Sequence, residues 1–188
     1  MVRWAALLHD LGKPDTRVER RGEGTFYGHQ AVGAGLADHL LERLRFPGAM
    51  RAAIVHLVRE HMFDYRAEWS DAAVRRWVRR VGEAAVADLF DLRLADTLGN
   101  GSRSGFPTQL EPLRRRMEGV LAADHALHVA DLAVDGADVM RVLGIGPGPG
   151  VGEALEALLE EVLEEPARNT RPVLLARLAE RRTARGEA

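Results

Sequence analysis

The chain has 188 residues, of which 46% are hydrophobic, so it is long enough for one well-buried domain with a small appendage. It contains no cysteine, which excludes disulfide bonds and thiolate zinc sites and leaves His, Asp and Glu as the strong metal ligands. The formal net charge of −2 gives no general attraction to nucleic acid, so any RNA contact must be local.

The first residues of the chain, MVRWAALLHDLGKP, are apolar over too short a stretch to cross a bilayer. The His9-Asp10 pair would also interrupt the apolar region of a signal peptide. We therefore expect a cytoplasmic protein with no membrane partner.

Apolar residues recur three and four positions apart along nearly the whole chain, which predicts an all-α protein. The first predicted helix covers residues 2–11 and ends at Gly12, with Pro14 as the terminator. The loop over residues 15–28 is rich in Arg, Glu and Gly, and we expect a hairpin-like excursion there. The second helix, residues 29–45, is predicted to bury a stripe of four apolar residues: Val32, Leu36, Leu40 and Leu44.

Three further helices are predicted before the clearest break in composition, the segment GNGSRSGFP at residues 99–107. They begin near Gly48 and cover residues 70–81 and 83–98. We place a domain boundary at the break, which gives a helical bundle over residues 1–106 and a smaller helical C-terminal module over residues 107–188. The helices expected in this module cover residues 108–127, 136–143 and 152–165 and a last stretch from Arg171.

Four of the predicted helices each direct a potential metal ligand towards the core. Burying an unpaired carboxylate or imidazole is costly, so these side chains need partners. Each one alone could be a satisfied core or capping residue. A shared divalent metal is the simplest partner for the whole set, which consists of His9, Asp10, His29, His61 and Asp96. Nitrogen and oxygen ligands of this kind suit Mn, Ni, Mg, Fe or Zn.

These residues, in this order, resemble the motif of the HD-domain phosphohydrolase superfamily, in which a His-Asp pair is followed by one or more His residues and then by Asp. The segments WAALLHDLGKPDTR, GTFYGHQAVGAGLADHLLERLRFP, VREHM and RLADTLGNG are similar to the HD region in the C-terminal half of bacterial tRNA nucleotidyltransferases and poly(A) polymerases. The tail VDGADVMRVLGIGPGPGVGEALEALLEEVLEEPARN is similar to the C-terminal module of those enzymes. The resemblance therefore covers almost the whole chain.

The resemblance implies an HD-domain helical bundle that acts as a metal-dependent phosphohydrolase, in which a metal-activated water attacks phosphorus and Asp10 completes the catalytic site. Our hypothesis assigns His9, Asp10 and Asp96 to one metal, with His29 and His61 able to hold a second. Lys13 could contact the substrate phosphate as a catalytic cation, or could be an ordinary cation at the C-terminal end of a helix. The expected substrate is a nucleotide, a 2',3'-cyclic phosphate or an RNA end.

The sequence departs from this family in two respects. It lacks the nucleotidyltransferase head with its catalytic carboxylates, so CCA addition and polyadenylation are not implied. The superfamily also places a metal-binding His some tens of residues before the His-Asp pair, whereas only eight residues precede the pair here.

RNA binding is the rival function. Four arginines of the helix over residues 70–81 form a basic ridge that could bind a phosphate backbone, or a solvated face with carboxylate neighbours: Arg75, Arg76, Arg79 and Arg80. The helix over residues 152–165 holds six glutamates and no basic residue, so it would repel RNA. The resembled family uses its C-terminal half to help hold tRNA, which makes tRNA an implied partner.

Three interpretations therefore remain open. The chain could be a stand-alone phosphohydrolase, a catalytically weak or inert RNA-binding remnant, or a truncated piece of a nucleotidyltransferase in which Met1 marks a cut inside a helix. Because the first helix begins so abruptly, we also consider an apolar groove that a second copy fills, which would make a homodimer.

Overall fold

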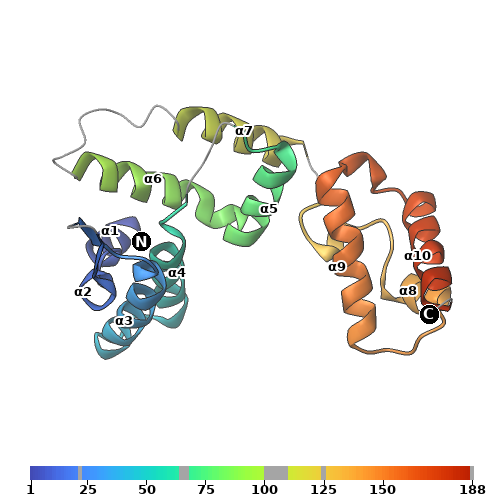
Figure 1. Cartoon of the computed structure of the whole chain (residues 1–188), viewed down its shortest axis with the longest axis horizontal. Coiled ribbons are helices and arrows are strands. Elements are labelled where there is room, and N and C mark those ends of the chain that lie inside the picture. Colours follow the sequence, from blue (N-terminus) through green and yellow to red (C-terminus); the bar gives the residue numbers. More distant parts are fainter. Residues whose placement is uncertain (21–22, 64–67, 100–109, 124–125, 187–188) are drawn as a thin grey trace. The chain divides into compact units, whose positions relative to one another are not determined.

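The computed structural model describes residues 1–20, 23–63, 68–99, 110–123 and 126–186. The prediction of an all-α protein is confirmed, since these residues are mainly helical and their one sheet is a short hairpin (Figure 1). The α-helices are α1 (Val2–Leu8), α2 (Lys13–Thr16), α3 (His29–Arg43), α4 (Gly48–Glu60), α5 (Asp71–Val81), α6 (Glu83–Gly99), α7 (Leu110–Ala122), α8 (Gly136–Leu143), α9 (Pro149–Glu164) and α10 (Arg171–Gly186). The 3-10 helices are η1 (Val129–Asp131) and η2 (Pro166–Arg168).

The expected hairpin-like excursion is confirmed. It consists of β1 (Val18–Arg20) and β2 (Glu23–Thr25), which pair antiparallel with Val18 opposite Thr25. The Thr25 hydroxyl donates to the Val18 carbonyl oxygen at 3.1 Å and ties the open ends of the strands together. The hairpin leads the chain into residues 26–28 and the start of α3.

The first helix ends earlier than predicted. α1 stops at Leu8, and His9, Asp10 and Gly12 lie in a turn before the short helix α2. The turn crosses α3 so closely that a Cβ on Gly12 would lie 2.2 Å from the His29 carbonyl oxygen. Only glycine fits this approach, so Gly12 holds the His9-Asp10 turn against the start of α3. Pro14 is not a terminator, because it occupies the first turn of α2, where a proline is tolerated.

The predicted apolar stripe of α3 is wrong. Val32 and Leu36 are 39% exposed and Leu44 is 52% exposed. The helix instead buries the neighbouring face, whose residues are mostly small: His29, Gly33, Ala34, Ala37 and Leu41. The face with small residues is the buried one because the turn around Gly12 lies directly on it, as the contacts of Gly12 and Gly33 show.

Two predicted boundaries in the C-terminal part also change. α7 ends at Ala122, short of the predicted residue 127. α9 begins at Pro149, three residues before the predicted start, because proline is well suited to the first helical position. The predicted hinge at residues 99–107 lies outside the described residues except for Gly99, which ends α6.

The described residues form two compact units. The first comprises Met1–Ala67 and Val81–Arg114. In it, α4 packs against α1, α3 and α6, and α1 also packs against α6. The core of this unit includes fully buried apolar side chains: Leu41, Ile54, Leu57, Leu89 and Leu92. The packing brings together the end of α1, the start of α3, the end of α4 and the last turns of α6.

The second unit comprises Glu68–Arg80 and Arg115–Ala188. α8 packs against α9 and α10 around buried leucines: Leu158, Leu159, Leu163, Leu174 and Leu178. The buried Asp138 carboxylate caps the start of α8 and also accepts hydrogen bonds from Arg141 and Arg171, which connects α8 with α10. The single predicted boundary between residues 106 and 107 stays a prediction.

Within the described residues, no helix is long and apolar enough to cross a membrane. The cytoplasmic location stays a prediction.

Candidate metal centre

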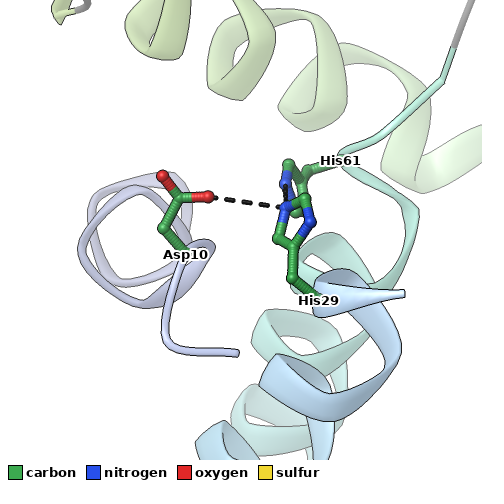
Figure 2. Close-up of side chains that lie close together, drawn as sticks. All are labelled: Asp10, His29 and His61. Atoms are coloured by element: carbon green, nitrogen blue, oxygen red, sulfur yellow. Dashed lines mark hydrogen bonds and ion pairs between the residues drawn. The ribbon is translucent and has the colours of Figure 1, made fainter. Parts of the chain in front are cut away.

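The five predicted ligands come together in the first unit. His9 directly follows α1, Asp10 comes next in the turn, and His29 is the first residue of α3. His61 directly follows α4, and Asp96 lies in the last turns of α6. Figure 2 shows how Asp10, His29 and His61 point towards one another from three different segments. Potential ligand atoms of these three residues all lie within 4.8 Å of one another.

The imidazole protons are fixed by backbone carbonyl groups. The Nδ1 atoms of His9 and His29 lie 2.8 Å from the carbonyl oxygens of Ala6 and Phe26. The Nδ1 atom of His61 lies 2.7 Å from the Val58 oxygen. A carbonyl oxygen can only accept, so each Nδ1 donates and each neutral ring presents a bare Nε2 lone pair. Histidines that ligate metals characteristically donate their other ring N–H in this way.

The Nε2 lone pairs of the three rings face other hydrogen-bond acceptors. The Nε2 atoms of His29 and His61 lie 3.2 Å apart, although neither carries a proton when both rings are neutral. The Nε2 atom of His9 is buried without a hydrogen-bond partner, 3.3 Å from Asp10 Oδ2 and 3.4 Å from Asp96 Oδ1. Acceptors that converge without a donor repel one another, and a cation between them removes the repulsion. The donor set therefore fits a divalent metal.

Asp10 lies between the two groups of ligands. Its Oδ1 atom is 3.5 Å from His29 Nε2, and its Oδ2 atom is on the side of His9. Its Oδ2 atom also accepts an ion pair from Lys13 Nζ at 2.6 Å. Asp96 is arranged similarly, with Oδ1 towards His9 and Oδ2 3.5 Å from an Arg93 nitrogen.

The His61 ring is held in its neutral form. The side chain is only 3% exposed, and this burial, with smaller effects from His9 and His29, lowers the pKa of His61 from 6.5 to about 4. A neutral imidazole is the form that binds metal, so the ring is ready to bind at neutral pH.

Lys13 lies within the site and is the first residue of the short helix α2. It follows the end of α1 by five residues, so it is not a cation in the last turn of α1. Its ammonium group pairs with Asp10 and lies 5.7 Å from the centre of the Phe26 ring. Its side chain remains 41% exposed and reaches the cavity, where the predicted contact with a substrate phosphate stays a prediction.

A cavity of about 530 Å³ opens onto the five ligands and Lys13. Sequence reasoning missed part of its lining: Thr25, Phe26, Tyr27, Gln30, Met62 and Arg93. In the sequence, only the positions of these residues relative to the predicted ligands connect them with the site. Phe26 and Tyr27 directly precede the start of α3, and Arg93 precedes Asp96 by one helical turn.

The predicted basic ridge of α5 faces the acidic helix α9 within the second unit. Arg75 is buried and donates to the carbonyl oxygens of Leu163 and Glu164 at 2.7 and 3.1 Å. Arg76 pairs with Glu160 and Glu164, both at 2.9 Å. Arg79 pairs with Glu156 and Glu160. Carboxylate neighbours thus engage this face, as the alternative interpretation expected, and we assign it no phosphate contact. Arg80 lines the same surface as Arg76 and Arg79.

Residues 1–101 match the HD domain family. This chain belongs to the HD domain family. Its relatives include the A-adding tRNA nucleotidyltransferase of Deinococcus radiodurans, 41% identical over 163 residues, which cover 85% of this chain and 37% of that enzyme. The CC-adding tRNA nucleotidyltransferase of Thermus thermophilus is 39% identical over 165 residues, 87% of this chain and 36% of the relative.

The multifunctional CCA protein of Verminephrobacter eiseniae is 35% identical over 138 residues, 72% of this chain and 33% of the relative. The HD-domain chain thus spans about a third of the length of these curated relatives. The resemblance to tRNA nucleotidyltransferases is confirmed. No solved structure matches the chain significantly.

Proposed function

We propose that this HD domain is a divalent-metal-dependent phosphohydrolase that acts on nucleotides or RNA ends, as a phosphomonoesterase or a cyclic phosphodiesterase. The observation that carries the proposal is the convergence of three imidazole Nε2 atoms and two carboxylates. The Nε2 atoms of His29 and His61 lie only 3.2 Å apart. The cavity volume supports it, because small-ligand pockets measure about 300–1,000 Å³.

The arrangement supports two groups of ligands that share Asp10. His9, Asp10 and Asp96 would hold one ion, and His29 and His61 would hold a second with the other Asp10 oxygen. When bound, the metal supplies Lewis acidity that activates water and stabilises charge on the phosphoryl group. The backbone carbonyls behind the three rings keep the imidazoles oriented, and Lys13 offers a positive charge to the phosphate at the cavity wall.

Metal content tests the proposal first. Protein purified without chelator or nickel affinity should carry metal, and a Mn²⁺ titration by calorimetry should give near-stoichiometric binding. Asp10→Asn and His61→Gln should each weaken binding by about 100-fold or more, since even outer-shell partners of a ligand contribute 10–100-fold. Metal-stimulated hydrolysis of p-nitrophenyl phosphate and 2',3'-cyclic AMP should disappear in both variants.

The matched control is His39→Gln, because His39 is exposed on α3 and does not line the cavity. It should bind Mn²⁺ as the wild type does. A wild-type protein that stays empty in millimolar Mn²⁺ or Ni²⁺, or Asp10 and His61 variants that keep wild-type hydrolysis, would show that the proposal is wrong.

A second candidate function is binding of tRNA without catalysis. The relatives favour this function, because two of them are named tRNA nucleotidyltransferases and a third is named a multifunctional CCA protein. Salt-sensitive retention of tRNA by the protein, unchanged by Mn²⁺ and by Asp10→Asn, would support this function and count against the phosphohydrolase.

A homodimer remains a proposal as well. Both α1 and α3 carry exposed apolar residues, among them Leu7 of α1, which is 70% exposed. Light scattering should report twice the mass of the chain, and a monomer at all concentrations would refute the dimer.

A further inference from the structure

We propose that Arg93 binds the substrate at this site and that its guanidinium donates hydrogen bonds to the non-reacting oxygens of a phosphate ester. The inference deepens the proposed function and rests on it. Arg93 lies on α6 one turn before Asp96, its side chain is only 22% exposed, and it lines the cavity that opens onto the metal ligands. It is thus a mostly buried cation directed at the place where a substrate would lie.

The contacts of Arg93 leave it available for a ligand. Among the described residues, its guanidinium has one polar contact, from Nη1 to Asp96 Oδ2 at 3.5 Å, which is at the limit of a hydrogen bond. Arginines with structural roles here bind far more closely, as Arg75 does to Leu163 at 2.7 Å. An arginine that served to position Asp96 would hold the carboxylate through two short parallel hydrogen bonds. Arg93 does not.

Arg93 and Lys13 hold similar positions, each beside one carboxylate of the centre. Each carboxylate of the centre has one oxygen near a cation, Asp10 Oδ2 near Lys13 and Asp96 Oδ2 near Arg93. Both cations line the cavity. A phosphate ester that reaches the ligands therefore meets a cation beside each carboxylate.

The charges of the lining fit a phosphate dianion. The charges of the two carboxylates, Asp10 and Asp96, balance those of Lys13 and Arg93. Each bound divalent ion would then add a charge of +2, which is equal and opposite to that of a phosphomonoester dianion. The planar fork of arginine matches two phosphate oxygens at once, which the point charge of Lys13 cannot do.

The test separates substrate binding from metal binding. Affinities for Mn²⁺ and for inorganic phosphate are measured by calorimetry on the full chain, the latter with and without saturating Mn²⁺. Arg93→Gln should keep Mn²⁺ affinity within about threefold and lose about tenfold or more in phosphate affinity, since hydrogen bonds to charged groups contribute this much. Arg93→Lys should recover part of the loss. With p-nitrophenyl phosphate, KM should rise more than kcat falls.

The control is Arg43→Gln, because Arg43 is exposed in the last turn of α3 and does not line the cavity. It should change neither affinity. Unchanged phosphate affinity in Arg93→Gln would overturn the inference. So would a loss of Mn²⁺ affinity together with normal phosphate binding at saturating Mn²⁺, which is the signature of a residue that only positions Asp96.

The two proposals fail in different ways. If the wild type binds no metal, the phosphohydrolase proposal is wrong, and the phosphate titrations without Mn²⁺ still decide the role of Arg93. If the wild type binds both Mn²⁺ and phosphate while Arg93→Gln equals it in both, only the Arg93 assignment is wrong.

Discussion

A single hydrogen bond to each imidazole decides what this centre can bind. Because the carbonyls of Ala6, Phe26 and Val58 hold the protons on Nδ1, all three Nε2 atoms turn lone pairs inward. Without these carbonyls a ring could turn an N–H inward and satisfy a neighbour directly. The backbone therefore leaves three common core residues able to ligate a metal.

The buried His61 ring should make the metal-free protein sensitive to acid. Its pKa is lowered from 6.5 to about 4 by burial, so the unfolded chain takes up the proton first as the pH falls. The stabilising contribution is complete above pH 6.5 and is lost progressively down to about pH 4. When the pH is lowered from about 7.5 to about 5, protonation of this group in the unfolded chain should lower the unfolding free energy by about 2 kcal/mol.

Urea unfolding in the presence of a chelator measures the effect. The wild type should lose about 2 kcal/mol more than His61→Gln over the same pH interval, because the variant cannot titrate at this position. Equal losses in the two proteins would mean that burial does not hold the ring neutral.

At the residue scale, the sequence predicts well which polar side chains come together and predicts the cavity wall poorly. Asp96 and His61 stand out because a polar residue interrupts or ends an apolar stripe. Arg93 carries no such signal, since an arginine on a helix is usually solvated and nothing in the pattern says that the cavity lies beside it. Tyr27, 78% exposed at the cavity rim, is equally silent in the sequence.

Among the elements, α3 shows why a correct helix can be given the wrong face. Two rows of apolar residues follow the same spacing along it, one rich in leucine and one in alanine and glycine. Hydrophobicity favours the leucine row, but the turn at Gly12 lies against the row that contains Gly33 and Ala37. The close approach of two backbone segments decided the face, and only the structure shows which segments meet.

Gly12→Ala tests this close approach. The new methyl group would lie 2.2 Å from the His29 carbonyl oxygen and 2.6 Å from the Gly33 nitrogen, so the backbone must shift. We expect a loss of about 3 kcal/mol in unfolding free energy and weaker Mn²⁺ binding, because His29 moves with its backbone. Denaturant unfolding and calorimetry measure the two effects.

Gly35→Ala is the matched control on the same helix, because a Cβ there meets nothing within 4 Å. It should stabilise the protein by up to about 1 kcal/mol, the difference in helix propensity between the two residues. If Gly12→Ala behaves like Gly35→Ala, the turn does not constrain α3.

For the molecule as a whole, the ligands belong to one unit and the acidic and basic helices to the other. The sequence shows both charged helices but not that they pair, because Arg76 and Glu160 are separated by more than eighty positions and charge patterns carry no information on partners. The sequence alone therefore leaves the basic ridge open to RNA, whereas in the structure its partner lies in the same chain.

Metal should stabilise the two units unequally. All five ligands lie in Met1–Ala67 and Val81–Arg114, so Mn²⁺ at 100 times its dissociation constant should stabilise this unit by about 2.7 kcal/mol. Hydrogen exchange followed by mass spectrometry should show slower exchange in peptides from α3, α4 and α6. Peptides from α8, α9 and α10 should exchange as in the metal-free protein, and equal protection there would contradict a site confined to one unit.

The path of the chain has a further consequence for how this protein can change over time. The chain passes from one unit to the other after residues 67, 80 and 114, so α5 belongs with helices that come much later in the sequence. A single recombination point between residues 99 and 107 would graft a foreign C-terminal part onto an α5 whose arginines suit a different α9. The two halves of the gene are therefore not freely interchangeable cassettes, and substitutions at Arg76 or Arg79 should be inherited together with compensating ones at Glu156 and Glu160.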